Sequence, residues 1–147
     1  MIREFSKKDT AAVMQVWIET IVVAHDFVNS NYWHDALESM KNNYILNSDS
    51  YVYLKDGGIV GFISIIEGNT IGAIFVEKPF QGKGIGEALI DYVKNKYEKL
   101  YISVFEKNKS AQSFLLNRGF KFEYKQHDVN TGEEELLYVW EKRKNEL

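Results

Sequence analysis

The stretch TIGAIFVEKPFQGKGIGEALI, residues 70–90, decides the fold of this chain. It begins as an apolar run typical of a buried strand, breaks at Pro79, enters a glycine-rich turn and continues as an amphipathic segment typical of a helix. Glycine at positions 82, 84 and 86 removes side chains where backbone amides would approach a ligand, and the start of the following helix carries a partial positive charge. The stretch therefore predicts a strand, an anion-binding loop and a helix, with a phosphate or pyrophosphate as the ligand.

The residues before this stretch predict three strands and two helices. Residues 2–5 alternate as a short strand, and apolar residues recur every three or four positions between 13 and 24, which is typical of a helix packed on a core. A second helix is expected to begin after Ser30 and to keep helical spacing as far as residue 44. Residues 51–55 and 59–66 predict two strands joined by a tight turn, which continue into the strand at residues 70–77 as an antiparallel meander.

The residues after the glycine-rich turn predict a strand that returns beside residues 70–77. The helix after the turn is expected to end near residue 97, and the apolar run at 100–105 then forms a parallel neighbour through a crossover connection. A further helix at 110–118 ends at Gly119, a residue suited to a helix C-cap. Residues 120–126 and 134–140 predict a closing hairpin, and the charged tail at 141–146 is expected to be a frayed end.

Composition limits the functions that this chain can have. Its 147 residues, of which 45% are hydrophobic and 27% charged, predict one globular domain over residues 1–147. The formal net charge of -3 argues against nucleic-acid binding, and the absence of cysteine excludes disulfides and thiolate chemistry. No apolar run approaches the roughly 20 residues that span a bilayer, and the first residues lack the apolar core of a signal peptide. We expect a cytoplasmic protein without a membrane or nucleic-acid partner.

The glycine spacing separates three kinds of phosphate-binding loop. A Walker A loop requires Ser or Thr after its Gly-Lys pair, but Gly82-Lys83 is followed by Gly84. A dinucleotide-binding loop requires a further glycine at position 87 or 89, where the chain has Glu and Leu. The pattern that fits is Gln81-x-x-Gly84-x-Gly86 between a strand and a helix.

At these residues the chain resembles the GCN5-related N-acetyltransferase (GNAT) superfamily, whose coenzyme A signature is Gln or Arg-x-x-Gly-x-Gly or Ala. A second resemblance is Asn108-x-x-Ala111-x-x-Phe114, which is followed by Gly119-Phe120. The order of the expected elements is also the order of that fold. The resemblance implies an α+β fold, a three-layer α/β sandwich with a mixed, mostly antiparallel seven-stranded sheet and about four helices.

The resemblance also implies which residues bind the cofactor. The backbone amides of residues 81–86 would hold the coenzyme A pyrophosphate, the backbone of Phe75 and Val76 would pair with the pantetheine arm, and Asn108 would contact the same arm. No metal is implied. The expected cofactor-binding residues are Phe75, Val76, Gln81, Gly82, Lys83, Gly84, Ile85, Gly86, Asn108, Ala111 and Phe114.

The proton-transfer residues stay open, because the chain departs from the family at two positions. Many relatives carry a tyrosine where this chain has Leu115, and some carry a glutamate where it has Ser103. A general acid contributes about 100-fold to 10,000-fold, but a thiol with a pKa near 8.5 is already a tolerable leaving group. The catalytic candidates are the backbone amide of Val76, which would polarise the thioester, and the side chains of Tyr138, Glu67 and His25.

The acceptor groove of this fold lies between the first two helices. The candidates there are Asp26, Phe27, Tyr32 and Trp33, and the segment is similar to that of small bacterial lysine or amino-terminal acetylases. Aromatic rings with a carboxylate suit an alkyl ammonium group. We expect an acetyl-CoA-dependent N-acetyltransferase acting by direct attack of a primary amine in a ternary complex, as a monomer or homodimer. The acceptor would be a protein lysine or N-terminal amine. A small-molecule amine acetyltransferase and a catalytically weak acetyl-CoA-binding module are the alternatives.

Overall fold

The computed structural model describes residues 1–143, so the end of the charged tail lies outside the described residues. The α-helices are α1 (Thr10–Ala24), α2 (Ser30–Asp35), α3 (Leu37–Ser39), α4 (Ile85–Lys94) and α5 (Lys109–Asn117). The strands are β1 (Ile2–Glu4), β2 (Asp49–Lys55), β3 (Gly58–Ile66), β4 (Thr70–Val76), β5 (Lys99–Phe105), β6 (Lys121–His127) and β7 (Glu134–Glu141). Within this range no helix is both long enough and apolar enough to cross a membrane.

The strands form one mixed sheet in the order β1-β2-β3-β4-β5-β7-β6. Every neighbouring pair is antiparallel except β4 and β5, which are parallel. The predicted meander, crossover and closing hairpin are therefore confirmed, as is the mostly antiparallel seven-stranded sheet. The position of β7 between β5 and β6 is a feature that the element order alone does not predict.

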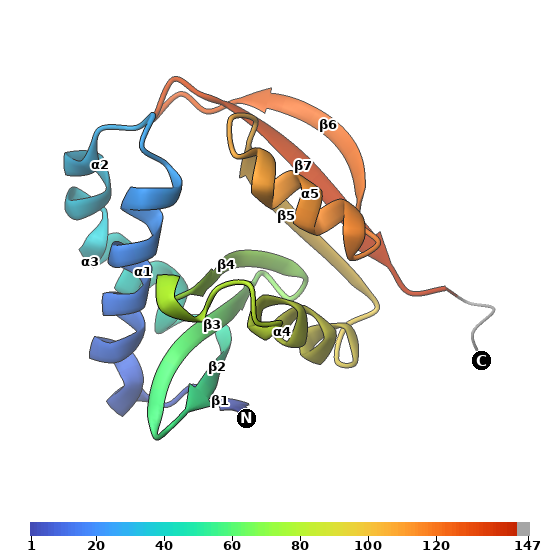
Figure 1. Cartoon of the computed structure of the whole chain (residues 1–147). Coiled ribbons are helices and arrows are strands. Elements are labelled where there is room, and N and C mark those ends of the chain that lie inside the picture. Colours follow the sequence, from blue (N-terminus) through green and yellow to red (C-terminus); the bar gives the residue numbers. More distant parts are fainter. Residues whose placement is uncertain (144–147) are drawn as a thin grey trace.

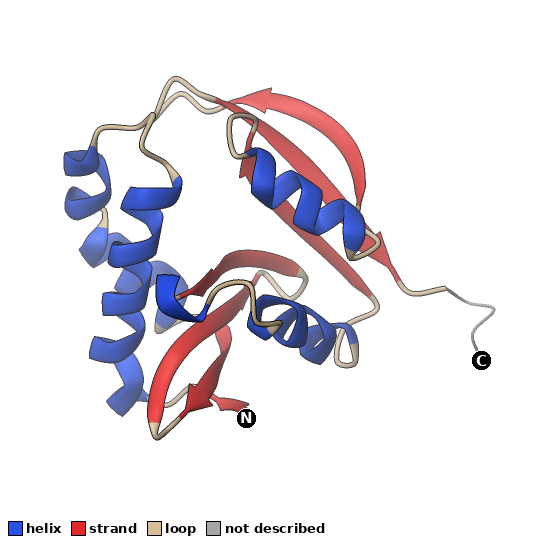
Figure 2. Ribbon diagram, in the orientation of Figure 1, coloured by secondary structure: helices blue, strands red, loops and turns tan. Residues whose placement is uncertain are grey.

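Helices cover both faces of the sheet, as Figures 1 and 2 show. Side chains alternate between the faces of a strand, so neighbouring residues enter different cores. Val52 and Phe62 pack in the cluster that contains α1 and Trp33, whereas Ile63 on the same strand as Phe62 packs in the cluster that contains α4. The three-layer arrangement thus follows from strands that are apolar on both faces.

The second predicted helix is interrupted, which gives five α-helices in the described residues where the sequence predicts about four. At Ala36 the backbone has ψ of -4°, away from the regular helical value. The chain continues as the short α3 and then as a π-helical turn, Met40–Ile45. Trp33 and Met40 both remain in the core, so the predicted apolar face survives the break.

An ion pair fixes the start of the fold. The Asp9 carboxylate is buried and accepts hydrogen bonds from the Arg3 guanidinium at 2.7 and 2.9 Å. It also accepts one from the Ser6 amide at 2.9 Å. The hydrogen bond from Arg3, with the Ser6 amide and the charge of Arg3, lowers the pKa of Asp9 to about 2, against the effect of burial. Ser6 and Asp9 thus form a capping box at the start of the first helical segment.

The parallel strands β4 and β5 separate soon after they meet. Their pairing is limited to Thr70 with Tyr101 and Ile71 with Ile102, although β4 continues to Val76 and β5 to Phe105. The two strands diverge beyond this pairing (Figure 1). The sheet therefore opens toward the end of β4 that precedes the glycine-rich loop.

Candidate active site

Two cavities lie where β4 and β5 diverge. The outer cavity, of about 390 Å³, is bordered by the end of β4, the glycine-rich loop and the start of α5. The inner cavity, of about 220 Å³, lies between β4 and β5 and reaches β7. The residues that line both are His25, Ile74, Phe75, Asn108, Ala111 and Phe114. The shared lining makes the two cavities neighbouring parts of one cleft.

The glycine-rich loop lines the outer cavity and has backbone amides without an acceptor among the described residues. Gly82 and Gly84 have φ of 76° and 85°, a left-handed conformation that side chains disfavour. The Gln81 side chain secures the loop by donating to the Val76 carbonyl at 2.8 Å. No amide from residue 82 to residue 87 donates a hydrogen bond to an acceptor among the described residues. These donors lie at the N-terminus of α4, where the helix dipole favours an anion.

The backbone of β4 also presents a donor to the cleft. The Glu77 amide donates to the Val60 carbonyl of β3 at 2.8 Å. Amides along a strand alternate in direction, so the preceding amide, that of Val76, points away from β3 and toward the divergence. Val76 lines the outer cavity. An extended ligand along this edge of β4 would meet a hydrogen-bonding strand.

Asn108 and His25 link the two sides of the cleft. Asn108 caps α5, because its side-chain oxygen accepts from the Ala111 amide at 3.1 Å. Its side-chain nitrogen lies 3.1 Å from His25 Nε2, and His25 Nδ1 lies 3.2 Å from the Ile21 carbonyl. These partners assign the proton to Nδ1, so Nε2 accepts from Asn108. Burial lowers the pKa of His25, in keeping with a neutral ring.

An aromatic cluster borders the inner cavity on the side of α1 and α2. The ring of Phe105 lies 5.1 Å from His25, 5.5 Å from Phe27 and 6.1 Å from Trp33. The ring of Tyr32 lies 4.8 Å from that of Trp33. Three of the four predicted acceptor-side residues therefore meet in one cluster. None of the four lines either cavity, and Asp26, the fourth, is exposed. The cluster reaches the inner cavity through His25 and Phe105, which line it.

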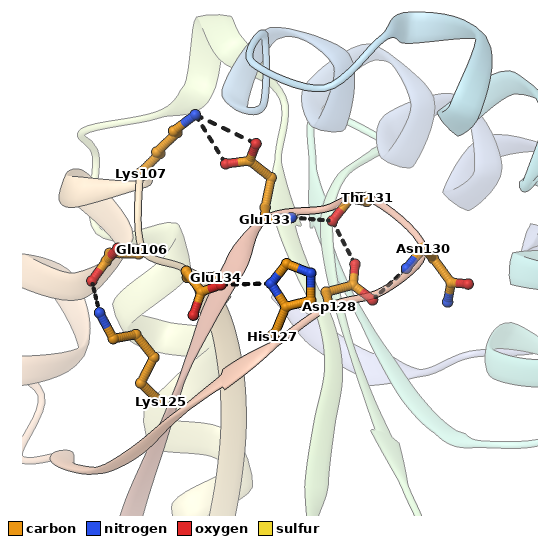
Figure 3. Close-up of polar contacts among 9 residues, drawn as sticks. All are labelled: Glu106, Lys107, Lys125, His127, Asp128, Asn130, Thr131, Glu133 and Glu134. Atoms are coloured by element: carbon orange, nitrogen blue, oxygen red, sulfur yellow. Dashed lines mark hydrogen bonds and ion pairs between the residues drawn. The ribbon is translucent and has the colours of Figure 1, made fainter.

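The turn between β6 and β7 carries a set of polar contacts, which Figure 3 shows. Glu133 pairs with Lys107 at 3.1 Å, and Glu134 pairs with His127 at 2.6 Å. The ammonium of Lys107 also lies 5.6 Å from the centre of the Phe27 ring. The turn is thus tied to the loop between β5 and α5 and borders the aromatic cluster.

The predicted cofactor-binding residues meet at the cleft with one exception. All of them line at least one cavity except Lys83, whose ammonium lies 5.9 Å from the centre of the Phe80 ring. Gly86 has a packing role as well, because a Cβ there would lie 3.5 Å from the Phe114 ring. Contact between α4 and α5 at this point holds Phe114 against the cleft.

Two of the catalytic candidates lie apart from the cleft. Tyr138 is 3% exposed and belongs to the core cluster that contains α4. Glu67 is exposed in the turn before β4, with φ of 53°. Neither lines a cavity, so the geometry gives no support to a catalytic role for them. Leu115 is 1% exposed and lines the inner cavity, which places an apolar side chain where many relatives carry a tyrosine.

Several lining residues are absent from the predicted site. Thr20 and Ser110 line the outer cavity, whereas Phe105 and Glu135 line the inner one. Phe105 is the last residue of a predicted strand, and that position could have indicated a site residue. Glu135 is harder to predict from the sequence, because its place at the cavity depends on the register of β7 against β5.

Comparison with known proteins bears on this site. A family model described as an acetyltransferase (GNAT) domain matches residues 16–134. The chain is similar to the peptidyl-lysine N-acetyltransferase YiaC of Escherichia coli, with 35% identity over 120 residues that cover 82% of each protein. It is also similar to the peptidyl-lysine N-acetyltransferase YjaB of Salmonella typhimurium, with 26% identity over 121 residues and 82% of each protein covered.

Solved structures share the fold. The solution structure of apo YjaB from Escherichia coli aligns with a TM-score of 0.82 and 20% identity, over 97% of this chain and 98% of that one. The crystal structure of the ribosomal-protein-S18-alanine N-acetyltransferase from Escherichia coli aligns with a TM-score of 0.74 and 16% identity, over 96% and 92%. The opening between β4 and β5 therefore belongs to a fold found in other acetyltransferases.

Proposed function

The chain belongs to the GNAT acetyltransferase family, and from that premise we propose that it transfers the acetyl group of acetyl-coenzyme A to the side-chain amine of a protein lysine. The observation that supports the cofactor assignment is that the amides of residues 82–87 have no acceptor among the described residues and that all of these residues except Lys83 line the outer cavity. The relatives named as peptidyl-lysine N-acetyltransferases support the choice of lysine.

The outer cavity suits the pyrophosphate and the pantetheine arm of coenzyme A. The loop amides and the start of α4 would receive the pyrophosphate oxygens, which are anionic acceptors. The edge of β4 at Val76, whose amide points away from β3, would pair with a pantetheine amide in the manner of an added strand. The Phe75 amide points toward β3 by the same alternation, so Phe75 lines the cavity without offering a backbone donor to it. Ala111 and Phe114 would supply apolar contact from α5. The acetyl group would then lie toward the inner cavity, which is continuous with the outer one.

The proposed reaction requires that the amine is positioned against the thioester and that the thioester carbonyl is polarised. The Val76 amide would donate to the thioester oxygen and stabilise the negative charge that develops there. The cleft would hold the amine against the carbonyl carbon, and an arrangement of this kind can supply about 7–11 kcal/mol of the barrier. Leu115 offers no hydroxyl to the departing sulfur. A thiol with a pKa near 8.5 leaves without one at a reduced rate.

His25 acts in this proposal as a positioning residue. Both of its ring nitrogens have partners, and burial lowers its pKa, so it holds the end of α1 against the start of α5. Phe105, which lines the inner cavity, would contact the alkyl chain of the acceptor lysine, and the rings of Phe27 and Trp33 pack against it. A cytoplasmic location and a monomeric or homodimeric state remain predictions from the sequence.

Release of free thiol from acetyl-coenzyme A tests the proposal. The acceptors are an amino-terminally blocked peptide with one lysine, the same peptide with acetyllysine, a peptide with a free amino terminus, and a polyamine. We expect thiol release with the lysine peptide, an acetyl group on its lysine by mass spectrometry, and none with the acetyllysine control. Turnover of the polyamine alone would favour the small-molecule alternative. Acetyl-coenzyme A binding without release on any acceptor would favour a binding module.

A further inference from the structure

Glu135 is a carboxylate on the wall of the inner cavity that no part of the site described above uses. It lies on β7 directly opposite Phe105 of β5, so the two side chains share the face of the sheet that meets the aromatic cluster. Of the residues that line the inner cavity, only His25 and Glu135 carry side chains that titrate near neutral or acidic pH. The acid therefore lies beside Phe105 on the wall of the cavity toward which the acetyl group is proposed to point.

Glu135 differs from the acids beside it in having no partner. Glu133 and Glu134 pair with Lys107 and His127 at the surface (Figure 3). The Glu135 side chain makes no hydrogen bond or ion pair with any residue in the described range 1–143. It is half-buried, and burial raises the pKa of its carboxyl, with the nearby carboxylate of Asp128 acting in the same direction. An unpaired acid facing a cavity costs stability, which suggests a use for it.

The other titratable side chain on this wall is engaged. His25 Nε2 accepts from Asn108 and Nδ1 donates to the Ile21 carbonyl, so neither nitrogen has a free lone pair for a substrate proton. Leu115 and Phe105 add only apolar surface. Glu135 is left as the side chain of the inner cavity that can both attract an ammonium group and accept its proton.

We propose that Glu135 binds the ammonium group of the acceptor and serves as the general base of the acetyl transfer. The proposal rests on the acetyltransferase function proposed above. The Glu135 carboxylate takes one proton from the ammonium, and the freed nitrogen lone pair forms a bond to the thioester carbonyl carbon. The carbon–sulfur bond breaks, its electron pair leaves with sulfur, and the sulfur takes the second proton lost by nitrogen. The products are the amide and the free thiol, and Glu135 returns its proton to water.

The test compares Glu135→Gln with Glu134→Gln, a change in the neighbouring residue that faces away from the cavity. For each protein, kcat/KM for the lysine peptide is measured across pH, with the affinity for acetyl-coenzyme A and the thermal midpoint. We expect Glu135→Gln to lower kcat/KM about 100-fold at pH 7 and to leave the acetyl-coenzyme A affinity unchanged. The deficit should shrink as pH rises toward the lysine pKa near 10.4, because solvent then supplies free amine. Glu134→Gln should stay within about twofold of the wild type.

The stability readout separates catalysis from folding. The raised pKa of Glu135 means that ionising it in the folded state is unfavourable, so stability falls as pH rises through its unfolded value, and a neutral glutamine should not lower the midpoint at pH 7. A deficit in kcat/KM that is equal at every pH, or an active Glu135→Gln protein, would overturn the role of Glu135 alone. A wild-type protein that acetylates no amine would overturn the proposed function, and this role with it.

Discussion

The two halves of the cleft are built from different parts of the chain. The half proposed for the cofactor is lined by the glycine-rich loop and the edge of β4, which belong to one continuous stretch. The half proposed for the acceptor is lined by Phe105 and Glu135, with Phe27 and Trp33 packed against Phe105, and these residues come from four separate segments. The cofactor half should therefore respond to changes in backbone conformation and the acceptor half to truncated side chains.

The largest expected effect is on the cofactor half. Gly84→Val forces a β-branched residue into a φ of 85°, a strain of about 1–3 kcal/mol, or it displaces the loop amides. The free loop relaxes to relieve this strain, and binding has to restore it, so the affinity for coenzyme A should fall about 5-fold to 150-fold by calorimetry, with a smaller change in KM for the peptide. Gly57→Val is the control, because Gly57 has φ of 81° in the turn between β2 and β3. It should carry similar strain without loss of affinity, and an equal loss would remove the loop from the site.

A smaller effect is expected when the acceptor half loses one ring. Phe105→Leu removes the ring that lines the inner cavity, and one ring contact with the acceptor is worth about 0.5–1.5 kcal/mol. Steady-state kinetics should show KM for the lysine peptide raised about 2-fold to 12-fold at an unchanged coenzyme A affinity. Phe122→Leu, at a 53% exposed position on β6, should leave both values near those of the wild type. A selective loss of coenzyme A affinity in Phe105→Leu would reverse the assignment of the two halves.

Asn108 contacts both α5 and His25. Different substitutions of Asn108 should therefore affect either the stability of the fold or the pKa of His25. Asn108→Ala removes the cap of α5 and should cost about 1 kcal/mol in the free energy of unfolding. Asn108→Asp keeps the cap oxygen but replaces the donor to His25 by a carboxylate, which should raise the pKa of His25 from its lowered value. NMR titration of the histidine ring measures this pKa. An unchanged pKa would mean that the hydrogen bond between the two side chains does not form in solution.

The ion pair between Arg3 and Asp9 lies outside both halves and should affect neither affinity. The folded pKa of Asp9, about 2, is below its unfolded value, so its contribution is present above about pH 4 and is lost as pH falls toward 2. Asp9→Asn should lower the free energy of unfolding by about 1–3 kcal/mol at pH 7, measured in urea. It should also weaken the pH dependence of stability in that window. A change in coenzyme A affinity would show that the fold transmits strain from β1 to the loop.

The cofactor half comes from one contiguous stretch and the acceptor half from separate segments, and this difference explains which parts of the site the sequence predicts. The residues from Gln81 to Gly86 are contiguous, and their glycines report a backbone conformation that local physics requires, so the cofactor loop is readable without a structure. Glu135 lies opposite Phe105 only because β7 inserts between β5 and β6, a register that no local pattern encodes. The sequence favours Tyr138, three positions along the same strand, but its side chain lies on the opposite face of the sheet, in the core. The strands and helices are predictable from the spacing of apolar residues and from the turn residues. The interruption of the second predicted helix at Ala36 is not.

The account makes the backbone amides of the loop the binding site for coenzyme A, and amide NMR tests that claim most directly. Uniformly 15N-labelled protein is titrated with coenzyme A, and the amide signals of residues 82–87 are followed together with those of Gly57 and Gly132 as distant glycines. The account predicts large saturable shifts for the loop amides and slower hydrogen exchange in the complex, with the distant glycines unmoved. Binding that leaves the loop amides at their free positions and exchange rates would contradict it.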